Sequence, residues 1–373
     1  MITSVIIKNF KPYRNQEFSL GRLNLLAGLN GSGKSSLLQA LLVLRQSFDQ
    51  GLLGNEHATL NGNLVRLGRF IEALFESAEE KQISFALNFA SGQSFSCTLP
   101  AWDSDDRSGP VSIAASGEIF KHEALFRSGF RFLAAERIGP RIHYSLPDNE
   151  ALASGVGTFG EWTPYYLAKR ADDPAPNPGA YHPNAESSQL KHQIEAWMNE
   201  VSPGIRLHYG RTVAMDAVQL SYSFVTHRDT TSNYRPTNVG FGVSYTLPVV
   251  TTLLAAEPGD LILLESPEAH LHPQGQAKLG ELMSRAANSG VQIIVESHSD
   301  HVMNGIRVAA HQNLLKAEDV RFFYFSWNSE KQSGATQVET ILMNQDGRID
   351  KWPRGFFDEL DHSLEILLTP RKA

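Results

Sequence analysis

A glycine-rich stretch near the N-terminus has the residue types and the spacing of a phosphate-binding loop. The stretch AGLNGSGKSS covers residues 27–36, and in it Gly28, Gly33, Lys34 and Ser35 fit the pattern G-x-x-x-x-G-K-[ST]. In this pattern, backbone N–H groups and the N-terminus of the following helix cradle phosphates, the lysine reaches the β and γ oxygens, and the serine binds Mg²⁺. A glycine-rich structural turn is the alternative. The residues predicted to bind the nucleotide here are Asn30, Gly31, Ser32, Gly33, Lys34, Ser35 and Ser36.

The segments on either side of this loop predict a strand before it and a helix after it. The run RLNLLA, residues 22–27, is short and mostly apolar, which is typical of a buried strand. The run SSLLQALLVLRQSF, residues 35–48, has apolar residues at helical spacing. The loop is therefore expected at a strand-to-helix turn, the context that the phosphate-binding pattern requires.

An acidic residue that ends a later apolar run is the second element expected of a nucleotide site. In LILLESPEAHLHP, Glu265 follows four apolar residues. This is the position of a Walker B carboxylate, which holds Mg²⁺ through water beside the phosphate loop. A solvated glutamate at a strand end is the alternative. We expect Ser35 and Glu265 to bind the metal.

Two further segments carry groups suited to contact with phosphates. In NVGFGVSYTLP, Gly240, Gly242 and Ser244 stand just ahead of an apolar helical stretch. Small residues at a helix start expose N–H groups to a phosphate, which could belong to a second molecule. This signal is weak by itself, because glycine-rich turns are common. In IIVESHSDH, His298 follows a buried strand, where its imidazole could reach a γ-phosphate or a water molecule.

The composition is that of an ordinary globular protein without an internal disulfide. Of 373 residues, 42% are hydrophobic and 20% are charged, and the single cysteine, Cys97, is most simply a small buried apolar residue. No run approaches the roughly 18 apolar residues of a membrane span, and the N-terminus lacks a signal-peptide pattern. We therefore expect a cytoplasmic protein with no membrane contact. The net charge of −7 argues against a uniformly basic nucleic-acid-binding protein.

The order of strand and helix patterns predicts an α/β fold that is divided by a long insertion. Residues 1–50 predict two strands and then the strand, loop and helix of the phosphate site, and residues 238–325 predict apolar strands that alternate with helices. These later strands are expected at residues 260–265, 291–296 and 320–325. The middle region, 51–237, is interpreted as a mixed α+β insertion with antiparallel strands, and its segment 171–189 is too rich in Pro, Asn and Ser for a packed element. Residues 326–373 are expected to form a C-terminal tail subdomain.

The order of these motifs resembles the P-loop ABC-type ATPase heads of the OLD (overcoming lysogenization defect) and structural-maintenance-of-chromosomes-like families. The resemblance covers residues 1–50 and 238–305, and the ending DGRIDKWPRGFFDE is similar to that of a subgroup of bacterial predicted AAA ATPases with a WPxGFF tail. In such families, two heads enclose two ATP molecules, each held by the phosphate loop of one subunit and the signature segment of the other. The resemblance therefore implies ATP as the nucleotide and an ATP-dependent homodimer or higher oligomer. It implies the signature role for Gly240, Gly242 and Ser244 and the switch-histidine role for His298.

Two departures from the family pattern bear on the reaction. Family members usually have an acidic residue directly after the Walker B carboxylate, where it orients the attacking water, and here that position is Ser266. A serine hydroxyl is a poor general base, so we expect slow hydrolysis, with Glu268 or His298 as the replacement. The residues predicted to carry catalysis are Glu265, Glu268 and His298. OLD nucleases continue into a Toprim nuclease domain. Here too few residues follow position 325 to encode such a domain, so any cutting is expected from a separately encoded partner.

Some histidines and aromatic residues allow both a functional and a structural interpretation. Imidazole is a common metal ligand, and the histidines that could suggest a metal site are His270, His272, His298 and His301. The segment PEAHLHP is itself part of the family motif and needs no metal, so we expect no histidine–metal site. Lys11 and Tyr13 could touch the adenine, as residues near that position do in similar heads, but apolar packing of Tyr13 is at least as well supported.

Two other segments could contact partners. The segment RSGFRFLAAERIGPR, residues 127–141, carries four arginines interleaved with aromatics, a pattern that can hold nucleic acid but that also fits a structural or phosphate-sensing role. The tail KWPRGFFDE places Trp352, Phe356 and Phe357 beside charges, and these residue types are enriched in interface anchors. The same aromatics could instead cap the ATPase core.

Two functions are consistent with the sequence. The first is a slowly hydrolysing dimeric ATPase that regulates a separately encoded effector, expected to be a nuclease in antiphage defence, with DNA processing as a variant. The second is a scaffold or sensor that binds ATP to set its assembly state and barely hydrolyses it. In either case, the region 51–237 and the tail are expected to supply the docking surface.

Overall fold

A six-stranded sheet lies at the centre of the computed structural model, which describes residues 1–102, 108–115, 122–147, 155–212, 217–227, 229–327 and 335–369. Five of its strands are parallel, and β16 pairs antiparallel at one edge. From that edge, the strands are β16 (Thr336–Ile341), β15 (Val320–Trp327), β3 (Leu23–Gly28), β14 (Gln292–Glu296), β13 (Leu261–Glu265) and β9 (Phe130–Leu133). The three late strands predicted from apolar runs are thereby confirmed.

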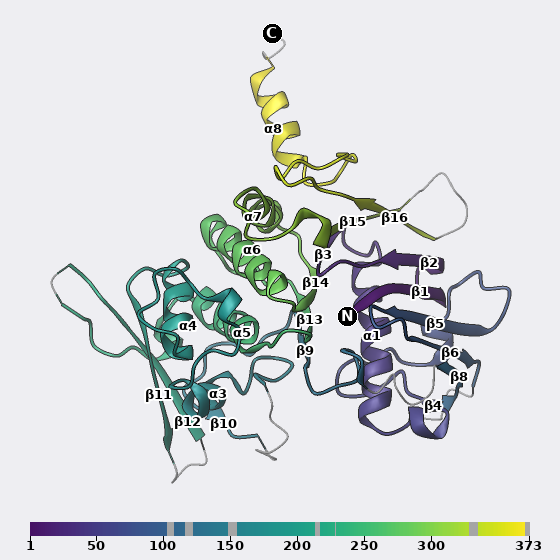
Figure 1. Cartoon of the computed structure of the whole chain (residues 1–373), viewed down its shortest axis with the longest axis horizontal. Coiled ribbons are helices and arrows are strands. Elements are labelled where there is room, and N and C mark those ends of the chain that lie inside the picture. Colours follow the sequence, from purple (N-terminus) through teal and green to yellow (C-terminus); the bar gives the residue numbers. More distant parts are fainter. Residues whose placement is uncertain are drawn as a thin grey trace.

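Apolar side chains alternate along the central strands, so each face of the sheet packs against a different core. On β3, Leu23 and Leu25 belong to the core that contains three of the later helices, whereas Leu26 belongs to the core that contains α1 (Lys34–Asp49). These three later helices are α5 (Phe241–Ala255), α6 (Pro273–Asn288) and α7 (Asp300–His311). Helices α5, α6 and α7 lie on one side of the sheet, and α1 lies on the other side (Figure 1). The central sheet is thus covered on both faces, as parallel sheets generally are.

The predicted helices α6 and α7 begin where their residue types indicate a helix start. Pro273 is the first residue of α6, and the ring of His272 accepts the N–H of Gln274 at 3.3 Å. At the start of α7, the hydroxyl of Ser299 accepts the N–H of Val302 at 3.0 Å. Proline has no N–H to satisfy at the first position, and the capping side chains satisfy N–H groups that the helix itself cannot. Both helices are therefore specified locally.

The N-terminal strands form a second, antiparallel sheet together with strands from the middle of the chain. In spatial order, these strands are β2 (Tyr13–Ser19), β1 (Ile2–Phe10), β5 (Gln82–Phe89), β6 (Ser94–Pro100) and β8 (Ser112–Ala115). Strand β9, also from the middle of the chain, pairs with β13 in the central sheet. Strands from residues 1–50 and from the region 51–237 therefore pair within the same sheets. The alternation of a short strand predicts its two faces but not its partner.

A third sheet and two helices form the remainder of the middle region. The sheet has the order β10 (Tyr144–Ser145), β12 (Ala217–Phe224) and β11 (Ile205–Thr212), and its pairs are antiparallel as predicted. The helices beside it are α3 (Thr163–Arg170) and α4 (Leu190–Asn199). The short elements elsewhere are α2 (Phe70–Ala73), the paired strands β4 (His57–Ala58) and β7 (Gly109–Pro110), and 3₁₀ turns at Leu53–Asn55, Pro178–Ala180, Pro236–Asn238 and Ala317–Asp319.

The segment 171–189 packs into the protein, contrary to the prediction from its composition. Ala175, Asn177 and Ala180 are each at most 2% exposed. The indole N–H of Trp197 on α4 donates to the carbonyl of Ala180 at 3.0 Å. Small side chains let irregular backbone approach the core closely, and a side-chain donor satisfies a carbonyl that regular structure would otherwise pair.

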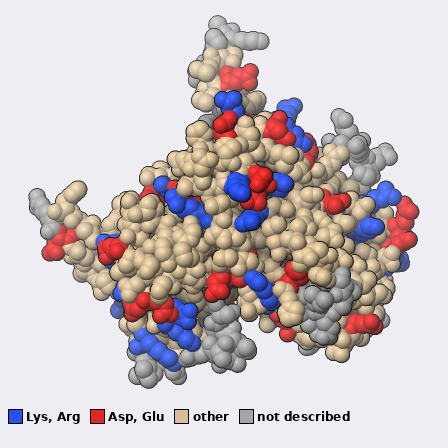
Figure 2. All heavy atoms as spheres, viewed as in Figure 1, with Lys and Arg blue, Asp and Glu red and all other residues tan. Residues whose placement is uncertain are grey.

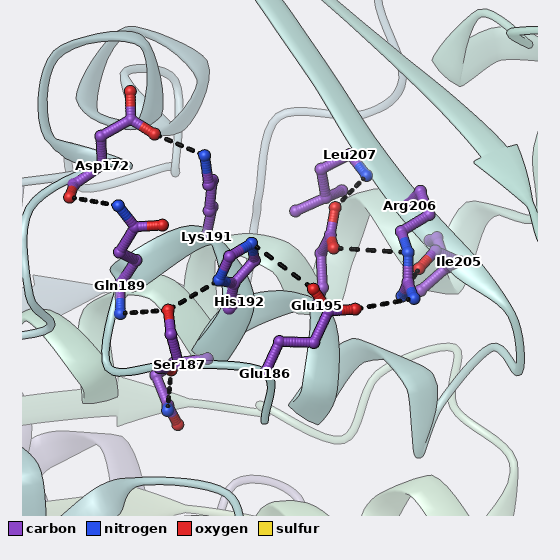
Figure 3. Close-up of polar contacts among 11 residues, drawn as sticks. Asp172, Glu186, Ser187, Gln189, Lys191, His192, Glu195, Ile205, Arg206 and Leu207 are labelled. Carbon is purple, nitrogen blue, oxygen red and sulfur yellow. Dashed lines mark hydrogen bonds and ion pairs between the residues drawn. The ribbon is translucent and has the colours of Figure 1, made fainter. Parts of the chain in front are cut away.

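Polar side chains at the end of this segment tie it to α4 and β11 (Figure 3). Ser187 Oγ lies 2.7 Å from Nδ1 of His192, and Glu186 pairs with Arg206 at 3.2 Å. Serine, histidine and glutamate are the residue types of a hydrolase triad, but Ser187 also accepts the N–H of Gln189 at 3.1 Å. This is the turn that leads into α4. We therefore interpret these residues as anchors of the segment.

The chain ends in α8 (Glu359–Leu368), a helix that projects from the body of the protein (Figure 1). Before it, Phe356 is 1% exposed and packs edge-on against Tyr324 of β15, with ring centroids 5.6 Å apart. Trp352 is 42% exposed, and the guanidinium of Arg307 lies 5.7 Å from its ring centroid. Phe356 thus caps the core, while Trp352 faces outward. No helix in the described ranges is both long and apolar enough to span a membrane.

Candidate functional site

The glycine-rich loop connects the end of β3 to the start of α1, at the strand-to-helix turn that its flanking patterns predict. Gly28 has a φ of 143° and Gly33 a φ of 100°, conformations that favour glycine. A Cβ on Gly28 would lie 2.2 Å from the carbonyl oxygen of Phe325 on β15, which no other residue type would tolerate. The first N–H groups of α1, which have no partner within the helix, open toward this loop.

Side chains from three other elements hold consecutive carbonyl groups of the loop. The bonds are Trp327 Nε1 to Gly31 O at 3.1 Å, Thr336 Oγ1 to Ser32 O at 2.8 Å, and Tyr13 Oη to Gly33 O at 2.6 Å. A trans peptide directs its C=O and the next N–H in opposite directions, so the N–H groups of Gly33 and Lys34 face away from these donors. A loop with N–H groups turned to one side can hold an anion. Trp327 and Thr336 are not predicted by the sequence pattern, because they lie 296 and 304 residues from their partners.

Lys11 and Tyr13, which were considered as adenine contacts, are engaged within the protein. Tyr13 is 1% exposed, so the packing interpretation of this residue is the correct one, and burial raises its pKa well above the usual value. Lys11 Nζ donates to Gln39 Oε1 at 2.6 Å. Both residues thus support the loop and α1 from the protein side.

Lys34 lies under the loop and is bonded to the loop's own carbonyl groups. Its Nζ donates to Gly28 O at 3.0 Å and to Leu29 O at 2.8 Å, and its side chain is 3% exposed. Burial lowers the pKa of Lys34, and the carboxylate of Glu296, with Oε1 3.9 Å from Nζ, opposes this change. The ammonium is therefore positioned to neutralise phosphate oxygens that enter the loop.

Two glutamates end neighbouring parallel strands beside the loop. Glu265 on β13 and Glu296 on β14 are partners in the strand register, and Glu265 Oε2 accepts the N–H of Ala135 at 3.0 Å. Burial raises the pKa of both carboxyl groups; for Glu296, the Ser35 hydroxyl and the Lys34 ammonium oppose the rise and Glu265 adds to it. Glu265 was predicted from the sequence as a site residue, but Glu296 was not. The signal was present, because IIVE ends in a glutamate just as LILLE does.

The turn after Glu265 is hydrogen-bonded to the end of β14 and to the segment that follows β14. Ser266 has a φ of 43°, and its N–H donates to the carbonyl of Glu296 at 2.8 Å. Glu268 is 9% exposed, and its Oε1 accepts the backbone N–H of His298 at 2.8 Å. The carboxylate predicted as a replacement base thus also fixes the backbone at the predicted switch histidine.

His298 opens on a pocket beside the phosphate loop, and the C-terminal tail helps to line it. The pocket has a volume of about 340 Å³ and is bounded by Gly28, Leu29 and residues 355–359. Leu29, at the rim, is 67% exposed. Asp358 and Glu359 of the tail therefore line the same pocket as the loop, an arrangement that the spacing along the chain does not reveal.

Most arginines of the segment 127–141 are used inside the protein. Arg127 and Arg131 pair with Asp260 at 3.3 Å and 3.4 Å. Arg137 is 3% exposed, and burial lowers its pKa to about 10. It donates to the carbonyls of Ala134 at 3.1 Å, Glu265 at 2.9 Å and Ser266 at 2.5 Å. These contacts support the structural interpretation of the segment, and on the face shown in Figure 2 basic and acidic side chains are interspersed.

The predicted signature segment begins α5 and lines a different pocket from the one beside Gly28. Gly240 is exposed, and a Cβ added there would meet open space, whereas Gly242 packs against the carbonyl of His270. Ser244 is 6% exposed, and its Oγ is buried and has no hydrogen-bond partner among the described residues. Of the three predicted phosphate contacts of this segment, Gly240 is thus the exposed one and Ser244 is buried.

Two of the histidines considered as metal ligands, His270 and His272, have other contacts. His270 packs against the rings of Phe241 and Tyr245, with centroids 4.8 Å and 4.9 Å away, and His272 caps α6. In the part of the chain that the structure describes, no three His, Cys, Asp or Glu side chains are arranged to hold a metal ion. A metal at the loop would thus also need oxygens from a nucleotide.

A parallel sheet, a phosphate loop at its strand-to-helix turn and acidic residues on the neighbouring strand ends define a P-loop ATPase domain. The chain belongs to the family described as "AAA domain, putative AbiEii toxin, Type IV TA system", whose model matches residues 23–304. A second model, described as "Protein of unknown function (DUF3696)", matches residues 315–367. A search of curated proteins found no match.

The fold is similar to that of Smc head domains, so the predicted α/β ATPase-head fold is confirmed. An SmcHead bound to the C-winged helix domain of ScpA is 13% identical with a TM-score of 0.56, and the match covers 91% of this chain and 97% of that one. An Smc head domain with an extended coiled coil bound to the C-terminal domain of ScpA, derived from Pyrococcus furiosus, is 13% identical with a TM-score of 0.53 and 98% coverage of both chains. At this identity the similarity concerns the fold.

Proposed function

We propose that the protein is an ATP-binding, slowly hydrolysing ATPase that dimerises on ATP and regulates a separately encoded effector. The geometry of the loop is the observation that supports ATP binding. Three side-chain donors hold the carbonyls of Gly31, Ser32 and Gly33 on one side of the loop. Backbone N–H groups and the buried ammonium of Lys34 are the donors available to a phosphate. These groups bind and orient the phosphates of the nucleotide.

The residues at the loop fit Mg²⁺. The hydroxyl of Ser35 and the carboxylate of Glu265 are oxygen donors of the kind that Mg²⁺ prefers, and Mg²⁺ is usually held by one or two carboxylates together with substrate phosphates. When bound, the metal neutralises charge on the β and γ phosphates. Glu265 is kept in place by the N–H of Ala135, so its carboxylate is already oriented at the strand end.

Slow hydrolysis is proposed because no carboxylate directly follows Glu265. The turn at Ser266 is fixed, since its N–H bonds to Glu296 O and its carbonyl accepts the guanidinium of Arg137. Glu268 is already bonded to the backbone of His298. General-base catalysis is typically worth about 10²- to 10⁴-fold, so turnover should fall below the usual range of about 1 to 10³ per second.

Dimerisation is proposed from the separation of the two predicted phosphate contacts. The exposed Gly240 lines a pocket that does not include the loop of its own chain. A phosphate held by one loop is therefore expected to meet the α5 start of a second copy, with the N–H groups of the first helical turn as donors.

A partner is proposed by analogy with the matching family and with the similar folds. The family description names a toxin of a toxin–antitoxin system, and the similar Smc heads are bound to ScpA domains. By this analogy the effector is a nuclease in antiphage defence, and α8, with Leu367 79% and Leu368 82% exposed, is its docking element together with the region 51–237. A scaffold or sensor with negligible hydrolysis, or a DNA-processing ATPase, is the alternative.

Phosphate release under single-turnover conditions tests the catalytic part of this proposal. A slow but measurable release that Lys34→Ala abolishes is expected, whereas no release above buffer would favour the sensor. Purification of the tagged protein from its own cells with an ATP analogue tests the partner. Recovery of a nuclease is expected. Full activity in cells that contain this protein without the partner would contradict the effector model.

A further inference from the structure

Glu296 is a buried acidic residue at the phosphate loop that lies outside the nucleotide-binding pattern of the sequence. It is the last residue of β14, which lies between β3 and β13 in the central sheet. Its partners in the strand register are Leu26, two residues before Gly28, and Glu265. Adjacent strands are about 4.8 Å apart, so the carboxylate of Glu296 stands between the loop and the carboxylate of Glu265.

The negative charge of Glu296 is incompletely compensated by the protein. The residue is 8% exposed, and its Oε1 lies 3.9 Å from Lys34 Nζ, which is the long limit of an ion pair. Its Oε2 is buried and has no hydrogen-bond partner in the described ranges. Buried charges are normally paired or coordinate a metal, and here the neighbouring Glu265 adds a second negative charge.

We propose that Glu296 supplies a second protein carboxylate to the Mg²⁺ site, beside Ser35 and Glu265. This inference rests on the proposed binding of a nucleotide at the same loop. Oε2, which takes part in none of the hydrogen bonds of the described residues, is an oxygen of the type that Mg²⁺ prefers, and it belongs to the carboxylate whose pKa the Ser35 hydroxyl lowers. Without the metal, two carboxylates repel the phosphates of a nucleotide, and with the metal they hold it. Glu296 therefore makes nucleotide affinity depend strongly on Mg²⁺.

Calorimetric titration of ADP into wild-type protein and Glu296→Gln, each with Mg²⁺ and with EDTA, tests the proposal. The amide keeps the size of the side chain and removes its charge. With Mg²⁺, Glu296→Gln should bind ADP at least about tenfold more weakly, since altered groups around a metal typically cost 10- to 100-fold in affinity. With EDTA it should bind ADP as tightly as wild type or more tightly, because the repulsion is reduced. Glu17→Gln, the same change at an exposed position on β2, should match wild type.

Paramagnetic Mn²⁺, used in place of Mg²⁺, gives a second readout that does not depend on activity. Its affinity for the ADP-bound protein should fall at least about tenfold in Glu296→Gln. An unchanged Mg²⁺-to-EDTA affinity ratio in the variant would overturn the proposal and leave Glu296 as a counter-ion of Lys34, while nucleotide binding by the loop would stand. If wild-type protein bound no ADP in either condition, the proposed function itself would fail.

Discussion

Replacement of Ser266 by glutamate should accelerate ATP hydrolysis. Ser266 occupies the position directly after Glu265, where an acidic residue usually orients the attacking water in similar heads. General-base catalysis is worth about 10²- to 10⁴-fold, which at about 1.36 kcal/mol per factor of ten corresponds to about 2.7 to 5.4 kcal/mol of activation free energy. Ser266→Glu should recover at least the lower part of this range.

The structure accommodates this substitution with little change in the free energy of unfolding. Ser266 already has a φ of 43°, so the strain of a left-handed residue is present in both proteins. The side chain is partly exposed, and the guanidinium of Arg137, bonded to Ser266 O at 2.5 Å, favours an ionised carboxylate nearby. The carboxylate of Glu265 acts in the opposite direction. The change in unfolding free energy should stay within about 1 kcal/mol.

Phosphate release at steady state and in a single turnover measures the effect, with Ser266→Gln as the control of equal size. At least a 100-fold rise is expected for Ser266→Glu and no rise for Ser266→Gln. The reasoning is refuted if Ser266→Glu binds ATP as wild type does and hydrolyses it no faster, or if the glutamine variant is accelerated equally.

Two other substitutions test the interface and the turn that carries Glu265. Gly240→Arg should abolish ATP-dependent dimerisation in sedimentation velocity without weakening ATP binding, because an added side chain at Gly240 meets open space within its own chain. Gly54→Arg, whose added side chain also meets open space, is the control. An intact ATP-bound dimer of the Gly240 variant would contradict the model. Arg137→Met leaves three carbonyls without their donor and should lower the free energy of unfolding by about 3 to 5 kcal/mol in urea titrations. The exposed Arg141→Met should change it by less than about 0.5 kcal/mol, and equal effects of the two would show that the bonds of Arg137 contribute little.

The parts of the site that the sequence predicts are those encoded by local spacing. Gly28, Gly33 and Lys34 are recognisable because the turn from strand to helix needs glycine conformations and a lysine at fixed offsets. Glu265 is recognisable because it ends an apolar strand. Glu296 also ends an apolar strand, but it becomes meaningful only when β14 is placed between β3 and β13, and this order belongs to the sheet rather than to the chain.

The parts that could not be predicted depend on contacts between distant segments. Thr336 holds the loop from 304 residues away, and no spacing rule links the two. Ser244 has the residue type of a ligand contact, yet the rotation of α5 turns its hydroxyl inward. The segment 171–189 lacks apolar periodicity, but its alanines are small enough to enter the core. In each case, tertiary packing decided the outcome.

The most direct test of the account is calorimetric titration of ATP with Mg²⁺ into wild-type protein and Lys34→Ala. The ammonium of Lys34 bonds only to Gly28 O and Leu29 O among the hydrogen bonds of the described residues, so its loss should leave the fold intact, with an unchanged far-UV circular dichroism spectrum. Saturable binding to the wild type and no detectable binding to Lys34→Ala is the predicted result. Equal affinity of the two proteins, or no binding to the wild type, would contradict the assignment of the loop as the ATP site.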